Sequence, residues 1–312
     1  MSELAIQTDK LEKVYSQLRA VDELSLNVPR GAIYGFLGRN GAGKTSTLKM
    51  LLGLVRPTAG GATVLGFPFG RGQLDILART AYVSETKTLY GTFTARELVR
   101  FTRGFYPHWS DDAVAKYSRS FEIPMDRPFA KLSLGNRTKV CLLLALAQKG
   151  DLLILDEPAS GLDPVAVDEF QRVLVEDLAS DGCTVLISSH QLADMERVAE
   201  WVGVIDHGKL LLEARLDDIK SQYRLVTAAG TALPHSKTAD IVSVTSNGDF
   251  CKYVLRQNAE AFAAGLRSQG ATVADVSPLG LREIFIELVR KEDSCTSGNA
   301  GATTASVSSP VS

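Results

Sequence analysis

Residues 38–45, Gly-Arg-Asn-Gly-Ala-Gly-Lys-Thr, constrain the fold of this chain more than any other segment. They match the pattern G-x-x-x-x-G-K-[ST], whose glycines let backbone N–H groups close around phosphate oxygens. The apolar residues 33–37 before the loop predict a buried strand, and residues 46–52 after it predict a helix. The N-terminus of such a helix adds a positive dipole beside a bound anion. The sequence therefore predicts a strand–loop–helix unit, as in α/β domains that bind phosphate groups.

Side chains of this loop have separate roles in the pattern. Lys44 is expected to reach the β- and γ-phosphates, and the hydroxyl of Thr45 is expected to hold Mg²⁺. The other residues that we expect to contact the nucleotide are Gly38, Asn40, Gly41, Ala42, Gly43 and Ser46. An ordinary glycine turn is the alternative, and the agreement of strand, loop, Lys-Thr pair and helix disfavours it.

Two acids follow a second apolar segment, residues 152–155. A carboxylate at the end of a buried strand beside a phosphate loop can bind Mg²⁺, which is the role expected for Asp156. The neighbouring Glu157 is then placed to polarise an attacking water molecule. Three further motifs stand in a fixed order around this pair: Leu-Ser-Leu-Gly-Asn at 132–136, Ser-Gly-Leu-Asp at 160–163 and Ser-Ser-His at 188–190.

With these motifs in this order, residues 4–223 resemble the ATPase subunit of an ABC transporter. The resemblance implies an α/β fold: a P-loop NTPase (RecA-like) core with an antiparallel β-subdomain and a helical subdomain inserted at residues 94–134. It implies that ATP and Mg²⁺ are the cofactors, with Tyr15 stacked on adenine. It also implies that Lys44, Glu157 and His190 act in catalysis, where His190 senses the γ-phosphate.

The resemblance further implies that two chains share each site. Ser133 and Gly135 match the signature motif, which caps the γ-phosphate bound by a second chain, either another copy or a homologous ATPase subunit. Leu134 and Asn136 depart from the usual glycine and glutamine of this motif. Because Ser133 and Gly135 are the phosphate-facing pair, we expect the motif to function.

Glu85 is the second departure, since it stands where the family carries a glutamine that touches Mg²⁺ and the attacking water. A carboxylate can also bind Mg²⁺, so Glu85 joins Thr45 and Asp156 as a predicted metal ligand. It adds negative charge near an anionic triphosphate, which can weaken nucleotide binding. The alternative is a solvated turn.

Composition limits the partners of the chain. It has 312 residues, 45% of them hydrophobic and 22% charged, as is typical of a globular protein. The formal net charge of −2 gives no support to a nucleic-acid partner. Apolar runs such as residues 141–147 are far shorter than the roughly 18 residues of a membrane-spanning helix. A membrane role must therefore come from a partner chain. The resemblance implies that this partner is a transmembrane permease subunit, which would hold a cytoplasmic chain at the inner face of the cell membrane.

The chain is expected to contain three parts. Residues 1–223 form the nucleotide-binding domain, residues 224–292 a small α+β accessory domain, and residues 293–312 a disordered tail rich in small polar residues. In the helical insertion, Phe105, Tyr106 and Trp109 form either part of the groove for the permease or internal packing between helices.

The function that the resemblance implies is ATP hydrolysis in a dimer that closes around two ATP molecules and drives a separate permease. One cassette followed by a C-terminal extension looks most like bacterial drug- or peptide-export ATPases, so we expect export. The alternative is a soluble ABC ATPase that acts as a regulatory or ribosome-associated module without a permease. Such ribosome-acting proteins usually carry two cassettes in one chain, whereas this chain has one.

Overall fold

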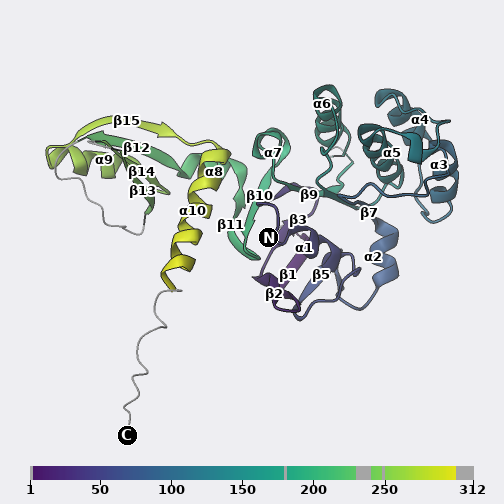
Figure 1. Ribbon diagram of the computed structural model, residues 1–312, viewed down its shortest axis with the longest axis horizontal. Coiled ribbons are helices and arrows are strands. Elements are labelled where there is room, and N and C mark those ends of the chain that lie inside the picture. Colours follow the sequence, from purple (N-terminus) through teal and green to yellow (C-terminus); the bar gives the residue numbers. More distant parts are fainter. Residues whose placement is uncertain (1–2, 179–180, 230–239, 248–249, 300–312) are drawn as a thin grey trace, which may run out of the picture. The chain divides into compact units, whose positions relative to one another are not determined.

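The computed structural model describes residues 3–178, 181–229, 240–247 and 250–299. The chain divides into two compact units, Met1–Leu216 and Asp217–Ser312. In Figure 1 the first unit runs from purple to teal and the second from green to yellow. The boundary lies a few residues before the predicted one at 223, because helix α8 (Leu216–Gln222) precedes the first strand of the second unit.

An antiparallel sheet forms the N-terminal part of the first unit. Its strands run in the order β2-β1-β5-β6, and β3 pairs with β1 as well. Their bounds are β1 Leu4–Tyr15, β2 Leu18–Leu24, β3 Asn27–Pro29, β5 Ala59–Val64 and β6 Phe67–Pro68. The turn between β1 and β2 places Tyr15 at the end of its strand. The predicted antiparallel β-subdomain is confirmed.

A six-stranded sheet in the order β11-β10-β4-β9-β8-β7 forms the core, with only β11 antiparallel to its neighbour. Its bounds are β4 Ile33–Leu37, β7 Thr80–Val83, β8 Leu152–Asp156, β9 Thr184–Ser189, β10 Trp201–Asp206 and β11 Lys209–Arg215. Strands β4, β8 and β9 are buried along their whole length, which explains their unbroken apolar runs. Because parallel strands end at one edge, the loops after β4, β7, β8 and β9 meet there.

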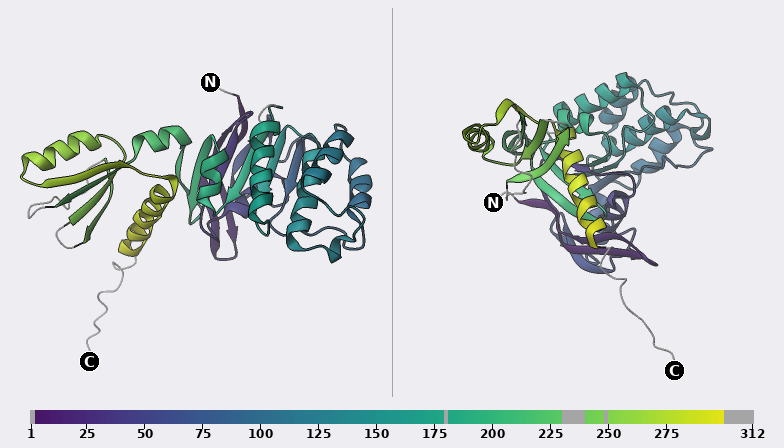
Figure 2. Two further views of the ribbon diagram at one scale, coloured as in Figure 1. Left: turned by 90° about the horizontal axis from the view of Figure 1, so that it is seen from above. Right: turned by 60° about the vertical axis from the view of Figure 1, so that its left-hand side comes forward.

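Helices pack around this sheet. Those outside the insertion are α1 Lys44–Leu51, α2 Gln73–Arg79, α6 Pro164–Arg172, the π-helical η2 Val173–Leu178 and α7 Leu192–Val198. The inserted helices are α3 Ala95–Arg103, α4 Asp111–Ser120, the 3₁₀ turn η1 Phe129–Lys131 and α5 Leu134–Ala147. A capping box of Thr94 and Glu97 starts α3, and Ser110 caps α4. Figure 2 shows α3, α4 and α5 grouped at one end of the unit, as the predicted helical insertion requires.

The second unit is a small α+β domain, as predicted. Its sheet has the order β13-β14-β12-β15, with all pairs antiparallel. After α8, its elements are β12 Arg224–Ala229, β13 Ile241–Asn247, β14 Phe250–Leu255, α9 Ala259–Ser268, β15 Thr272–Pro278 and α10 Leu281–Asn299. Val226 and Tyr253 of the sheet pack against Ala263 and Leu266 of α9.

The C-terminal helix differs from the sequence prediction. Residues 293–299 belong to α10, whereas their small polar composition predicts a disordered tail. The physical reason is that burial of Leu281 and Ile284 stabilises the start of α10, and adding residues to a formed helix costs less than starting one. The rest of the predicted tail, residues 300–312, lies outside the described residues. No helix within the described ranges is both long and apolar enough to cross a membrane.

Candidate active site

The loop between β4 and α1 has a backbone that only glycine fits. Gly43 has φ 107°, in the left-handed region that side chains disfavour. A Cβ at Gly43 would lie 2.3 Å from the carbonyl oxygen of Ala20, and one at Gly38 would lie 2.5 Å from that of Ile205. The loop is therefore closely packed between the antiparallel sheet and the end of β10.

An ion pair holds the same loop from the side. The guanidinium of Arg39 donates to both carboxylate oxygens of Asp206, at 3.0 and 2.6 Å. The N–H of Gly208 donates to the carbonyl of Ala42 at 3.0 Å. The side chain of Asp206 is only 2% exposed, so this bidentate pair is well shielded on one side. Sequence reasoning missed Arg39 and Asp206, whose partnership across the chain leaves no local pattern.

Lys44 lies inside the loop. Its ammonium donates to the carbonyls of Gly38 and Arg39, at 2.8 and 3.2 Å. It also lies 3.4 Å from Oε1 of Glu157, so the structure brings these two predicted catalytic residues together. A phosphate entering the loop would meet this ammonium together with the N–H groups at the start of α1.

Asp156 ends β8 and is fully buried. Its Oδ1 accepts a hydrogen bond of 2.5 Å from the hydroxyl of Ser188, which lies on the neighbouring strand β9. Its Oδ2 has no hydrogen-bond partner within the part of the chain that the structure describes. A buried carboxylate oxygen without a donor suits a cation ligand, because burial of a carboxylate is otherwise costly.

Glu157 leaves the strand in a left-handed conformation, with φ 47°. Its N–H donates to the carbonyl and the hydroxyl of Ser188, both at 3.2 Å. Its Oε2 lies 2.8 Å from Nδ1 of His190, at the end of β9. The carboxylate is thus fixed between Lys44 and His190, and a strained backbone of this kind is typical of functional sites.

Lys44 and Glu157 border a cleft of about 480 Å³, whose lining does not include the predicted site residues Gly38, Asp156 and His190. Of the predicted site residues, its lining includes Tyr15, Asn40, Gly41, Ala42, Gly43, Lys44, Thr45, Ser46, Glu85 and Glu157. Tyr15 is 41% exposed, and Nζ of Lys13 lies 4.9 Å from the centroid of its ring. A partly exposed aromatic ring and a phosphate loop that line one cleft fit the base and the phosphates of a nucleotide.

Ser133 and Gly135 lie elsewhere, at the start of α5, and neither lines the cleft. Ser133 caps the helix by accepting a hydrogen bond from the N–H of Asn136, at 3.3 Å. Leu134, between them, is 55% exposed. A Cβ on Gly135 would come within 2.7 Å of the carbonyl oxygen of Gly161, so the signature segment and the loop after Glu157 are in close contact.

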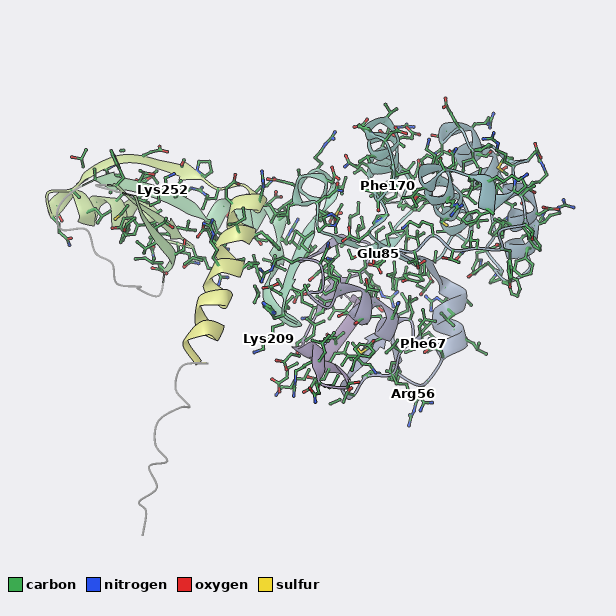
Figure 3. All side chains as sticks on the ribbon, in the orientation of Figure 1. Arg56, Phe67, Glu85, Phe170, Lys209 and Lys252 are labelled. Atoms are coloured by element: carbon green, nitrogen blue, oxygen red, sulfur yellow. The ribbon has the colours of Figure 1, made fainter. Side chains whose placement is uncertain are left out.

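Glu85 is exposed and lies in the loop after β7 (labelled in Figure 3). Two positions further, Lys87 is only 6% exposed and directs its ammonium at main-chain carbonyls. It donates to Ser84 at 2.7 Å and lies 3.4 Å from the oxygens of Asp156 and Glu157. Sequence reasoning missed Lys87, since a lysine in a polar loop is usually solvated.

The geometry agrees with the comparisons with known proteins. The sequence profile of the ABC transporter family matches residues 21–160. The bacitracin transport ATP-binding protein BcrA of Bacillus licheniformis is 38% identical over 222 residues, which cover 70% of this chain and 72% of that protein. The chain belongs to the ABC transporter ATP-binding proteins.

Other relatives of this ABC ATP-binding protein support the same family assignment. The lantibiotic transport ATP-binding protein SrtF of Streptococcus pyogenes is 30% identical over 68% of this chain and 91% of its own length. The solved structure of an ATP-binding subunit of an ABC transporter superposes with a TM-score of 0.64 and 28% identity, over 70% of this chain and 93% of that one.

The predicted family, fold and ATPase activity are confirmed. The protein hydrolyses ATP for a transporter whose permease is a separate subunit, and the alternative without a permease is not favoured.

An exposed aromatic cluster continues from the Glu85 loop of this ABC protein. It consists of Tyr90, Phe93, Phe101 and Phe105, with neighbouring ring centroids 5.2–6.0 Å apart. Tyr90 and Phe105 are 60% and 65% exposed. Of the aromatics that the sequence singled out, only Phe105 belongs to this cluster. Tyr106 and Trp109 are half-buried, and the indole N–H of Trp109 donates to Asp111.

Proposed function

We propose that this protein is the ATPase subunit of a bacterial exporter for peptide antibiotics or related drugs. Relatives with at least 30% identity are named for bacitracin, lantibiotic and multidrug transport. The observation that carries the mechanism is the buried carboxylate of Glu157, which lines the cleft and is fixed between Lys44 and His190. A carboxylate held in this way can orient a water molecule toward the γ-phosphate of ATP.

ATP fits the cleft with its phosphates on the loop and its base toward Tyr15. The N–H groups of residues 41–46 and the ammonium of Lys44 would bind the β- and γ-phosphates. Thr45, Asp156 and Glu85 would hold Mg²⁺, and the free Oδ2 of Asp156 fits this role. When bound, Mg²⁺ neutralises charge that develops on the transferring phosphoryl group. Tyr15 would stack on adenine, with Lys13 against its ring.

A single copy leaves the γ-phosphate uncapped, because Ser133 and Gly135 do not line their own cleft. A second copy, or a homologous subunit, would supply its Ser133 and Gly135 across a dimer interface. ATP binding would close this dimer and hydrolysis would open it, which is a ligand-driven population shift that a permease can use.

The aromatic cluster is the surface that we assign to the permease. Four adjoining rings, of which Tyr90, Phe101 and Phe105 are exposed, fit a partly apolar cytoplasmic helix of a membrane subunit. Such docking would place the protein on the inner face of the cell membrane. Phe105→Ala should weaken membrane association and leave the ATP cleft intact, whereas the exposed Phe250 of the second unit provides a matched Phe→Ala control.

The substrate class is tested by gene disruption in the cells that make this protein. Loss of the gene should increase the sensitivity of growth to bacitracin-like peptides and lantibiotics. The wild-type gene should restore resistance, and the gene carrying Glu157→Gln should not. Unchanged sensitivity to both peptide classes would refute the proposed substrates, while membrane association and ATPase activity remain independent measurements.

A further inference from the structure

Lys87 is a buried charge next to the active site. With 6% exposure, its ammonium is largely withdrawn from water, which is costly unless opposite charges or hydrogen-bond acceptors compensate. It has three carbonyl acceptors, those of Ser84, Asp156 and Glu157. Burial lowers the pKa of Lys87, and four surrounding groups oppose that shift: Cys141, Asp156, Glu85 and Glu157.

The same contacts fix the loop that carries Glu85. The hydroxyl of Ser84 donates to the carbonyl of Thr86 at 2.6 Å, which closes a tight turn around Glu85. Lys87 donates to the carbonyl of Ser84 at 2.7 Å and reaches across to the end of β8. The lysine therefore joins the turn to the backbone of the two residues that carry the site carboxylates.

Charge balance gives Lys87 a second effect. Glu85 and Glu157 both line the cleft, and Asp156 lies buried behind it. An anionic triphosphate entering this cleft is repelled by each carboxylate. With a neutral glutamine at position 85 this repulsion would be smaller. Lys87 stands two positions after Glu85 and is hydrogen-bonded to the same tight turn, so it supplies one positive charge against the one negative charge that Glu85 adds.

We propose that Lys87 is a positioning residue for ATP hydrolysis, which anchors the Glu85 loop to the end of β8 and balances the charge of Glu85. The proposal rests on the ATP cleft described above. It also gives a structural reason why a glutamate is tolerated at position 85. The charges of Glu85 and Lys87 sum to zero, which is the charge that a glutamine at position 85 would have. Through Lys87, a displacement of the Glu85 loop would also move the backbone that holds Asp156 and Glu157.

Three variants of the protein separate the effect of the Lys87 charge from the effect of the Lys87 hydrogen bonds that anchor the loop. Lys87→Gln keeps a hydrogen-bond donor and removes the charge, Lys87→Met removes both, and Glu85→Gln with Lys87→Gln restores the net charge. Dissociation constants for a fluorescent ATP analogue in EDTA report on charge in the absence of Mg²⁺, provided that the double variant restores them. Lys87→Gln should raise this constant about threefold to tenfold, as expected for one uncompensated charge near the site, and the double variant should return to within about twofold of wild type.

Steady-state hydrolysis of Mg-ATP reports on anchoring. Lys87→Met should lower kcat about tenfold or more, the order of loss that follows from a misplaced catalytic carboxylate. Adding Glu85→Gln should not restore its kcat, because the anchor is still missing. Lys252→Met, at an exposed lysine of β14 (labelled in Figure 3), is the matched control and should retain wild-type values.

Two results would overturn the proposal. Equal dissociation constants for Lys87→Gln and the double variant would refute charge balance, and a wild-type kcat in Lys87→Met would refute anchoring. Should Lys87→Met fail to fold, shown by its thermal melting curve, Lys87→Gln decides both points. Its side chain is too short to reach the carbonyls of Asp156 and Glu157, so its kcat should also fall although it keeps a donor. Wild-type protein that does not bind the ATP analogue would instead refute the proposed cleft itself.

Discussion

Two adjacent acids at the end of β8 have different surroundings. Asp156 is fully buried and keeps one carboxylate oxygen without a donor, which suits a metal ligand. Glu157 turns into the left-handed region, and its carboxylate lies between Lys44 and His190 at the cleft. The change of backbone conformation between consecutive residues is what directs two carboxylates to two roles.

Glu157→Gln should abolish turnover and keep ATP binding. The amide is nearly isosteric with the carboxylate but is a poor proton acceptor, so kcat should fall at least about 100-fold, as for loss of a positioned base. Phosphate release measures kcat, and a fluorescent ATP analogue measures binding. Glu260→Gln, at the exposed start of α9, is the control. Near-normal turnover in the Glu157 variant would contradict the assignment.

Glu85→Gln should change the Mg²⁺ dependence of ATP hydrolysis. Removing one carboxylate from the cleft lowers its attraction for the cation and lowers its repulsion of the triphosphate. The two effects change the rate of hydrolysis in opposite directions. The expected result is therefore a shift in the Mg²⁺ concentration at which hydrolysis is fastest. ATPase assays over a range of Mg²⁺ concentrations measure it, and superimposable curves for variant and wild type would place Glu85 in a solvated turn.

Among the elements, the start of α5 and the loop after Glu157 are in close backbone contact. Gly135 has no room for a Cβ, because the carbonyl oxygen of Gly161 would lie 2.7 Å from it. Gly161 itself has φ 82°, and a Cβ there would meet the side chain of Leu134. The signature segment and this loop are therefore positioned by each other, and movement of one displaces the other.

Gly135→Ala should separate these two elements and impair hydrolysis. We expect kcat to fall about tenfold or more, because misplaced catalytic groups lose rate steeply, while ATP binding to the same chain's cleft stays within about twofold. Paired ATPase and nucleotide-binding assays measure both. Gly265→Ala is the control, since a Cβ there meets nothing within 4 Å, and its helical site should tolerate or favour alanine. Unchanged kcat in Gly135→Ala would show that the close contact is dispensable.

At the scale of the whole protein, the phosphate loop and the signature segment are separate surfaces. The cleft is lined by residues of the antiparallel sheet, the phosphate loop, the Glu85 loop and Glu157, and by neither Ser133 nor Gly135. If both surfaces contact one ATP, as we propose, two chains are needed for each site. Dimerisation must then depend on nucleotide, because ATP itself forms part of the interface.

Mg-ATP should therefore drive dimerisation of the Glu157→Gln protein, which binds ATP and does not consume it. Sedimentation velocity with and without Mg-ATP measures the change. Adding Ser133→Ala should weaken the dimer, because it removes a hydroxyl from the signature segment and leaves the cleft complete. A monomer at saturating Mg-ATP with both segments intact would refute the shared site.

The site was predictable where it depends on sequence-local geometry. The glycines of the phosphate loop follow the buried strand β4, and Asp156 and Glu157 stand at the end of the buried strand β8. Parallel strands bring such ends to one edge. The pair of Arg39 and Asp206 was not predictable, because its partners are 167 positions apart. Lys87 was missed because only the fold shows that its side chain is buried within an otherwise exposed loop.

The aromatic cluster and the end of α10 also could not be predicted fully from local sequence. Phe105 was recognised from its local run of aromatics, whereas its packing with Phe101, Tyr90 and Phe93 requires α3 to lie beside the Glu85 loop. The end of α10 was missed for a different reason: composition describes the preference of isolated residues, and a helix already formed extends through residues of low preference.

The strand order of the core sheet has a consequence for synthesis of the protein. Strand β4, which leads into the phosphate loop, pairs with β9 and β10, which follow it by roughly 150 residues. At about 5–20 residues per second, the ribosome leaves β4 without either neighbour for on the order of 10–30 seconds. The nascent chain therefore exposes an apolar strand and an unformed loop for that time. ATP cannot assist the early steps, because its binding loop is completed only when β10 and Asp206 have emerged.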